Sequence, residues 1–149
     1  AGNLPDKVQA QYIPKQRTVY VRNGMSENAT FHAINRELAC AALDHHDGNY
    51  SRAESSAQAY CAAYVIAQKY GVDVQGFSFD KVCERQMKGE KEPKELRSFI
   101  HDVKNAAYAI EKQMNRNLGR SEQEFTQDEF AVPEENISKE SKNKKNPER

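Results

Sequence analysis

The sequence contains no long apolar run, few cysteines and no excess of either charge. No stretch of about 18 residues is apolar, and the N-terminus has neither the basic start nor the apolar segment of a signal peptide. The three cysteines, Cys40, Cys61 and Cys83, are widely spaced and form no CxxC pair, which argues against a disulfide framework. We therefore expect a soluble protein of the reducing cytoplasm that has no membrane partner.

The net charge of zero is the sum of two unlike parts. The 149 residues include 22 Lys and Arg and 22 Asp and Glu, so no strong overall field attracts nucleic acid or a membrane. Residues 121–149 hold eight acidic and five basic residues, which leaves 14 acidic and 17 basic residues in the first 120. This last segment also has only five apolar side chains, too few to offset the entropy cost of ordering it. We expect one domain over residues 1–120 and a disordered or linker tail over residues 121–149.

Apolar residues at every second position predict a β-hairpin near the N-terminus. Val8, Ala10 and Tyr12 alternate with polar residues, and Val19 and Val21 do the same after the turn-like residues 14–17. An antiparallel pair of strands is therefore expected, ending before residues 22–24.

Two helices with clear start signals are expected after the hairpin. The first follows Ser26 or Asn28 as N-cap and its pattern stops at residues 47–49. The second begins at the capping box of Ser51 and Glu54 and ends before Gly71. Its expected apolar face consists of Ala57, Cys61, Tyr64 and Val65.

Two further helices complete the expected fold. A short one covers about residues 78–88, and a long one begins at Pro93, where the first helical turn tolerates the missing N–H, and runs to Leu118. A stripe at helical spacing marks the long helix as a cover for the core: Leu96, Phe99, Ile100, Val103, Ala107, Ile110 and Met114. The fold class is therefore α+β, a hairpin or small sheet followed by about four helices, and mostly α.

The order of several short segments resembles a known family. These segments are residues 9–12 (QAQY), 19–21 (VYV), 36–41 (RELACA), 63–73 (AYVIAQKYGVD) and 77–79 (FSF). They look like the C-terminal metallopeptidase domain of ArdC-like and LtrC-like antirestriction and conjugation-associated proteins, and more distantly like ImmA/IrrE peptidases. The resemblance covers about residues 9–117. It implies a zincin-like fold and a protein of plasmids or conjugative transposons.

The resemblance places the family's zinc site on residues that differ from the family pattern. The two histidines of HExxH fall on Arg36 and Cys40, the general base falls on Glu37, and the third ligand, a Glu, falls near Gln58 or Tyr60. In a zincin the metal activates a water that the Glu deprotonates. None of the three ligand positions keeps the family residue, so the resemblance implies a degenerate HExxH in which Glu37 is a vestigial base.

The chemistry of the substituted residues argues against a metal cofactor. Arg36 carries a permanent positive charge and has no lone pair to donate to a metal. Cys40 can ligate only as one thiolate, which does not make a site. Without zinc nothing lowers the pKa of a water for Glu37. We expect no cofactor, with zinc only under the alternative below.

A rearranged metal site is the alternative. Cys40 and Asp44 lie one helical turn apart, and His45 or His46 follows them. A metallopeptidase with these ligands and Glu37 as base would need zinc. The simpler interpretation of the two histidines is a helix C-terminus, where a positive charge suits the dipole.

The leading hypothesis is a catalytically degenerate zincin-like domain that acts by binding. In it Arg36 fills the space of the lost metal, and we expect its partner to be Glu37 or Glu54. The binding partner is another protein or the rest of a larger polypeptide. A third hypothesis is a DNA-associated accessory module, but the sequence has no basic groove interleaved with aromatic residues to support nucleic-acid binding.

Overall fold

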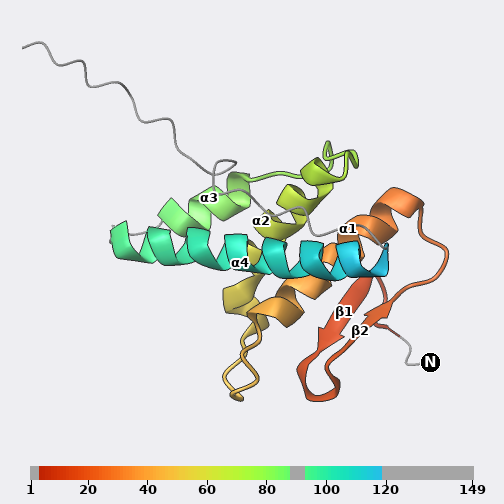
Figure 1. Ribbon diagram of the computed structural model, residues 1–149, viewed down its shortest axis with the longest axis horizontal. Helices are drawn as coiled ribbons and strands as arrows, with labels where there is room; N and C mark the ends of the chain where they lie inside the picture. Colours follow the sequence, from red (N-terminus) through yellow and green to blue (C-terminus); the bar gives the residue numbers. More distant parts are fainter. Residues whose placement is uncertain (1–3, 88–92, 119–149) are drawn as a thin grey trace, which may run out of the picture.

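The computed structural model describes residues 4–87 and 93–118 and has a β-hairpin followed by helices (Figure 1). Its elements are β1 (Ala10–Ile13), β2 (Thr18–Val21), α1 (Glu27–Leu43), α2 (Arg52–Lys69), α3 (Asp80–Met87) and α4 (Pro93–Asn117). The predicted α+β, mostly helical fold is confirmed. The tail expected over residues 121–149 lies outside the described residues. In the described ranges no helix is both long and apolar enough to cross a bilayer.

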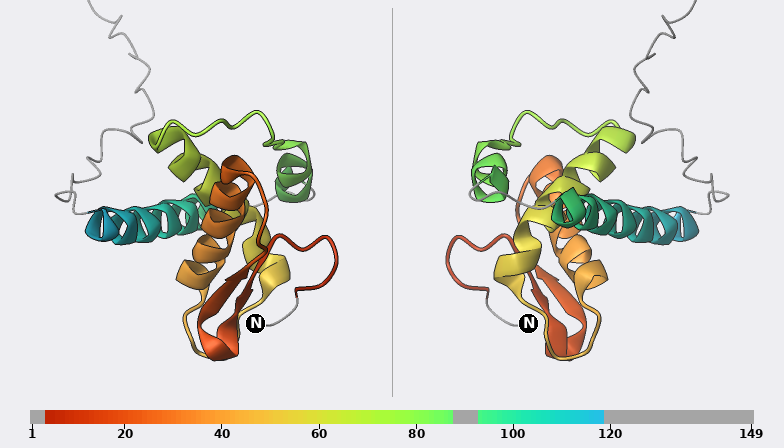
Figure 2. Two further views of the ribbon diagram at one scale, coloured as in Figure 1. Left: turned by 90° about the vertical axis from the view of Figure 1, so that its right-hand side faces the viewer. Right: turned by 90° about the vertical axis from the view of Figure 1, so that its left-hand side faces the viewer.

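The hairpin forms where the alternation predicts it. Its strands are antiparallel, with Ala10 opposite Val21 and Tyr12 opposite Val19, and Ala10 and Tyr12 point into the core. A single 3-10 turn, Pro14–Gln16, connects them. The hairpin lies beneath α1 and the start of α2 in both views of Figure 2. Strand β1 therefore lies next to α1, the helix on which the resemblance places the zinc site.

Helix α1 contacts both strands, α2 and α4, and is the centre of the fold. Its N-cap is Ser26, whose hydroxyl accepts a hydrogen bond from the backbone N–H of Ala29 at 3.3 Å. The helix ends at Leu43, a full turn before the expected stop at residue 47. The reason is local, because the Asp44 carboxylate accepts a hydrogen bond from the backbone N–H of His46 at 2.8 Å and turns the chain away.

Helix α2 begins and ends as predicted, but part of its predicted apolar face is wrong. The Ser51 hydroxyl accepts from the N–H of Glu54 at 3.4 Å, and Gly71 adopts the left-handed conformation, φ +68°, just beyond the last turn. The buried residues are small except for one isoleucine: Ala57, Ala59, Ala62, Ala63, Ile66 and Ala67. Of the predicted face only Ala57 is buried. The alanines allow α1 and α4 to approach α2 closely, and the larger side chains of α2 lie at the edges of this contact.

Helix α4 crosses the α1–α2 pair, as the sequence predicts (Figure 1). It is buried from its middle onward, through Val103, Ala107 and Ile110. The first part of the stripe is not core, because Leu96 is 44% exposed and Ile100 is 61% exposed. The helix is about 38 Å long, from 25 residues at 1.5 Å each, and its contact with the core begins at the partly buried Phe99.

The core lies where the hairpin, α1, α2 and α4 meet. Its buried members are mainly small or medium in size: Tyr12, Ala39, Cys40, Ala59, Ala62, Ile66, Val103, Ala106, Ala107 and Ile110. Two polar pairs tie α2 and its C-cap to α4, namely the ion pair of Lys69 with the buried Glu111 and the hydrogen bond from the Tyr70 hydroxyl to Asn115 at 3.0 Å. These contacts tie the C-terminal end of α2 to the second half of α4.

Candidate functional site

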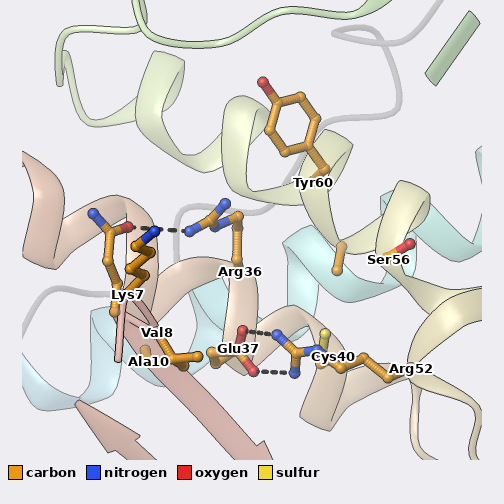
Figure 3. Close-up of a pocket in the computed structure, with 11 residues that line it drawn as sticks. Lys7, Val8, Ala10, Arg36, Glu37, Cys40, Arg52, Ser56 and Tyr60 are labelled. Atoms are coloured by element: carbon orange, nitrogen blue, oxygen red, sulfur yellow. Dashed lines mark hydrogen bonds and ion pairs between the residues drawn. The ribbon is translucent and has the colours of Figure 1, made fainter. Parts of the chain in front are cut away.

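The Glu37 carboxylate is buried on α1 and fully engaged with two partners. Its exposed fraction is 4%. One oxygen, Oε2, accepts from the backbone N–H of Tyr12 and from Nη1 of Arg52, both at 2.7 Å, and Oε1 accepts from Nη2 of Arg52 at 2.5 Å. Figure 3 shows the two parallel contacts of this bidentate pair. Glu37 therefore links α1 to the edge of β1 and to the first turn of α2.

This pairing decides what Glu37 can do chemically. A general base must reach the proton of a water within hydrogen-bond distance. Both carboxylate oxygens already accept hydrogen bonds from a peptide N–H and a guanidinium, neither of which can take up a proton. The pair raises the pKa of Arg52, chiefly through its hydrogen bond to Glu37, so the arginine stays charged. The arrangement is that of a structural ion pair.

The partner of Glu37 carries a signal in the sequence that the spacing argument missed. Arg52 occupies the first turn of α2, where the positive end of the helix dipole disfavours a cation. A nearby carboxylate offsets this unfavourable interaction. Glu37 is that carboxylate, and its partner comes from a different helix, which helical spacing alone does not reveal.

Arg36 does not pair with Glu37 or Glu54, so that prediction is wrong. Its Nη2 donates to the Gln9 side-chain oxygen at 3.4 Å, and its Nε is buried with no hydrogen-bond partner in the described part of the chain. The reason lies in helix geometry, since adjacent residues on a helix point in different directions. Glu37 points toward β1 and Arg52, whereas Arg36 points toward the segment that precedes β1 (Figure 3).

Cys40 lies beside this pair. The side chain is 3% exposed, and burial raises the pKa of its thiol. In this chain the thiol is therefore neutral. The hydroxyl of Tyr50 lies next to the sulfur, and burial together with the thiol raises the pKa of Tyr50 as well.

Of the two candidates for the third ligand position, Tyr60 faces the same pocket as Arg36 and Cys40. Its hydroxyl accepts a hydrogen bond from the backbone N–H of Ser78 at 2.6 Å. Gln58 has a buried side-chain oxygen with no partner among the described residues. Neither side chain offers the carboxylate that the family's site uses.

The residues of the rearranged site hold the end of α1. The Asp44 carboxylate accepts from the hydroxyl of Tyr12 at 2.9 Å and from the N–H of His46, and the His46 ring lies 3.3 Å away. Burial opposes the charge of Asp44, but these hydrogen bonds hold its pKa below the ordinary value. His45 is exposed. Within residues 4–87 and 93–118, no three His, Cys, Asp or Glu side chains are grouped as a metal site.

Tyr60 is positioned by a cluster of aromatic side chains. The spacing of apolar residues in the sequence does not reveal this cluster. The ring of Phe77 lies 4.9 Å from those of Tyr60 and His32 and 5.4 Å from that of Tyr64, measured between centroids. Phe79 also packs against Tyr64, at 4.9 Å, and its ring stacks on that of Phe77 at 6.5 Å. The Nε2 of His32 also lies 2.7 Å from the carbonyl oxygen of Asp73. The loop after α2 is thereby fixed against both α1 and α2.

These residues surround a pocket of about 350 Å³ between α1, α2 and the segment before β1. Three cations line it, Lys7, Arg36 and Arg52, together with a single carboxylate, Glu37. Tyr60 lies on the opposite side from Glu37 in Figure 3. The pocket thus coincides with the place where the resemblance puts a metal centre, and its lining is basic.

Comparison with protein-family models, with curated proteins and with solved structures gives no significant match for this chain. The resemblance to the ArdC-like and LtrC-like domains therefore depends on the short segments of the sequence alone.

Proposed function

We propose that this chain is a non-catalytic, zincin-like domain of the antirestriction type found on mobile elements, and that it acts by binding. The observation that carries the proposal is the pairing of Glu37 with Arg52 and with the backbone of Tyr12. At the position of a general base the chain has a structural carboxylate. At the position of a metal-binding histidine it has Arg36, whose charge repels a divalent cation.

Zinc content and proteolysis test the proposal together. The purified chain, incubated with zinc and desalted, is expected to retain no stoichiometric zinc by elemental analysis and to leave casein intact. Stoichiometric zinc together with cleavage that Glu37→Gln abolishes would overturn the proposal. That outcome would establish the alternative, a metallopeptidase that uses Cys40 and Asp44 or His45 as ligands.

A further inference from the structure

The charges of the pocket do not balance. Glu37 neutralises Arg52, which leaves Lys7 and Arg36 as cations. Neither forms an ion pair with a carboxylate in the described part of the chain. The pocket therefore has an excess of two positive charges at one end, where Lys7 and Arg36 lie in Figure 3.

Arg36 is prepared to bind an anion. Its Nε is buried and has no hydrogen-bond partner, and the Nη2 contact with Gln9 is long at 3.4 Å. A buried polar group without a partner is costly, so such a group needs an explanation. Guanidinium groups bind planar or tetrahedral oxyanions with two parallel hydrogen bonds. An oxyanion in the pocket would satisfy the free donors of Arg36.

Lys7 is held in an unfavourable conformation next to Arg36. Its φ is +69°, in the left-handed region that costs a non-glycine residue energy. The Arg22 side chain fixes the turn, because its Nε donates to the Val8 carbonyl at 2.9 Å and its Nη2 donates to the Pro5 carbonyl at 2.7 Å. A glycine would relieve this strain, yet the chain has a lysine at the rim of the pocket. The turn therefore presents a cationic side chain beside Arg36.

The charge and shape of the pocket select the class of ligand. Two uncompensated cations match a dianion, and a phosphate monoester carries a charge of about −1.5 to −2 at pH 7. A carboxylate or a phosphodiester carries only one charge. The volume of about 350 Å³ is within the range of small-molecule sites. A nucleic-acid strand instead needs a row of cations along a groove, whereas the excess charge here lies at one end of a single hollow.

We propose that this pocket binds the dianionic phosphate group of a small phosphate monoester, with Lys7 and Arg36 as its ligands. The inference rests on the proposed function, in which the site acts by binding, and names the chemistry that it binds. Arg52 remains with Glu37 and forms the floor of the pocket. Tyr60 forms the opposite wall, next to which the organic part of the ligand would lie.

Calorimetric titration of the full chain tests the inference with phenyl phosphate, dimethyl phosphate, acetate and a short single-stranded oligonucleotide. We expect saturable binding of phenyl phosphate at low salt, and at least about tenfold weaker binding of dimethyl phosphate and acetate. Binding of phenyl phosphate should strengthen as the pH rises through the second phosphate pKa, about 6, because the dianion then replaces the monoanion. Equal binding of all the small anions, or binding of the oligonucleotide alone, would overturn the inference.

Two variants and a matched control locate the site. Lys7→Gly and Arg36→Met should each weaken phenyl phosphate binding about tenfold. Arg17→Gly is the control, because Arg17 is also exposed and has a positive φ of +49° but lies at the hairpin turn away from the pocket. Lys7→Gly relieves strain and so should keep the melting temperature of the wild type. Its effect on binding can therefore be interpreted even if Arg36→Met unfolds. If Lys7→Gly and Arg17→Gly weakened phenyl phosphate binding equally, Lys7 would not be a ligand of the phosphate.

The outcomes for the two proposals are distinguishable. Absence of phosphate binding in a chain that lacks zinc and peptidase activity overturns the inference about the ligand and leaves the non-catalytic role in place. Zinc-dependent peptidase activity overturns the proposed function itself.

Discussion

Glu37 shows how a side chain's partners determine its role. In the family that the sequence resembles, the Glu of HExxH is a base because a metal-bound water lies beside it. In this chain the Arg52 guanidinium lies beside Glu37; the Arg52 side chain is 49% exposed and the Glu37 side chain is 5% exposed. The net contribution of such a pair to stability is small, but removing one partner leaves the charge of the other without an opposite charge beside it. The role of Glu37 is therefore measurable as stability.

Replacing Glu37 with glutamine should destabilise the protein. Glu37→Gln removes the charge from three hydrogen bonds, and we expect a loss of about 1–3 kcal/mol in the free energy of unfolding. The loss stays below the ~3–5 kcal/mol of a fully buried pair because Arg52 can be rehydrated. Urea denaturation measures it, with the exposed Glu84→Gln as control, expected within about 0.5 kcal/mol of wild type. Unchanged stability of Glu37→Gln would show that the pair has no structural role.

Asp44 should make stability depend on pH. The hydrogen bonds from His46 and Tyr12 outweigh burial and hold the pKa of Asp44 below the ordinary value in the folded state. The stabilisation is therefore present above the pKa of the unfolded chain, about 3.9, and is lost as the pH falls through the lower folded pKa. Asp44→Asn should lower the melting temperature at pH 7, and the gap from wild type should narrow below about pH 4. Thermal melts at several pH values measure the difference in melting temperature between Asp44→Asn and wild type. A difference that stays constant with pH would contradict the prediction.

The sequence draws attention to individual residues of the pocket but not to their partners. The resemblance singles out Arg36, Glu37 and Cys40, and all three line one pocket. Their partners, Arg52 and Lys7, come from other elements, and no periodicity relates residues across a turn or between two helices. The expected pairing of Arg36 with Glu37 or Glu54 was wrong for the same reason, since helical spacing does not show which side chains meet across a helix pair.

At the scale of elements, local chemistry explains where helices begin and packing explains which face they bury. Ser26 and Ser51 cap α1 and α2 through their own hydroxyls, so their positions can be predicted from the sequence. The buried face of α2 cannot be predicted in the same way, because an alanine can lie either on the surface or in a close contact between helices. Which of the two applies depends on the helices that pack against α2, namely α1 and α4.

Helix α4 offers a direct test of how far the core extends. Ile110 is 2% exposed and Ile100 is 61% exposed, although both belong to the same stripe. Ile110→Ala should cost about 2–5 kcal/mol of unfolding free energy because it leaves a cavity. The matched Ile100→Ala should stay within about 0.5 kcal/mol of wild type. Equal losses in urea denaturation would show that the N-terminal half of α4 is also covered.

At the scale of the whole molecule, a neutral chain contains a strongly localised charge. The two uncompensated cations of the pocket belong to the first 120 residues, which carry 17 basic and 14 acidic residues. Net charge says little about such a site, because the field inside a hollow depends on the few groups that line it. A balanced composition is therefore compatible with an anion site.

The boundary of the domain can be tested by shortening the chain. The core described above is built from residues between Tyr12 and Ile110, and residues 121–149 contain only five apolar side chains. A chain that ends at residue 120 should therefore keep its melting temperature within about 2 °C, a difference of less than ~0.5 kcal/mol for a domain of this size. Its net charge becomes positive, so phenyl phosphate should bind somewhat more tightly at low ionic strength. The two chains should bind equally at 0.15 M salt, where the screening length is about 8 Å. A large drop in melting temperature would place part of the last segment within the folded domain.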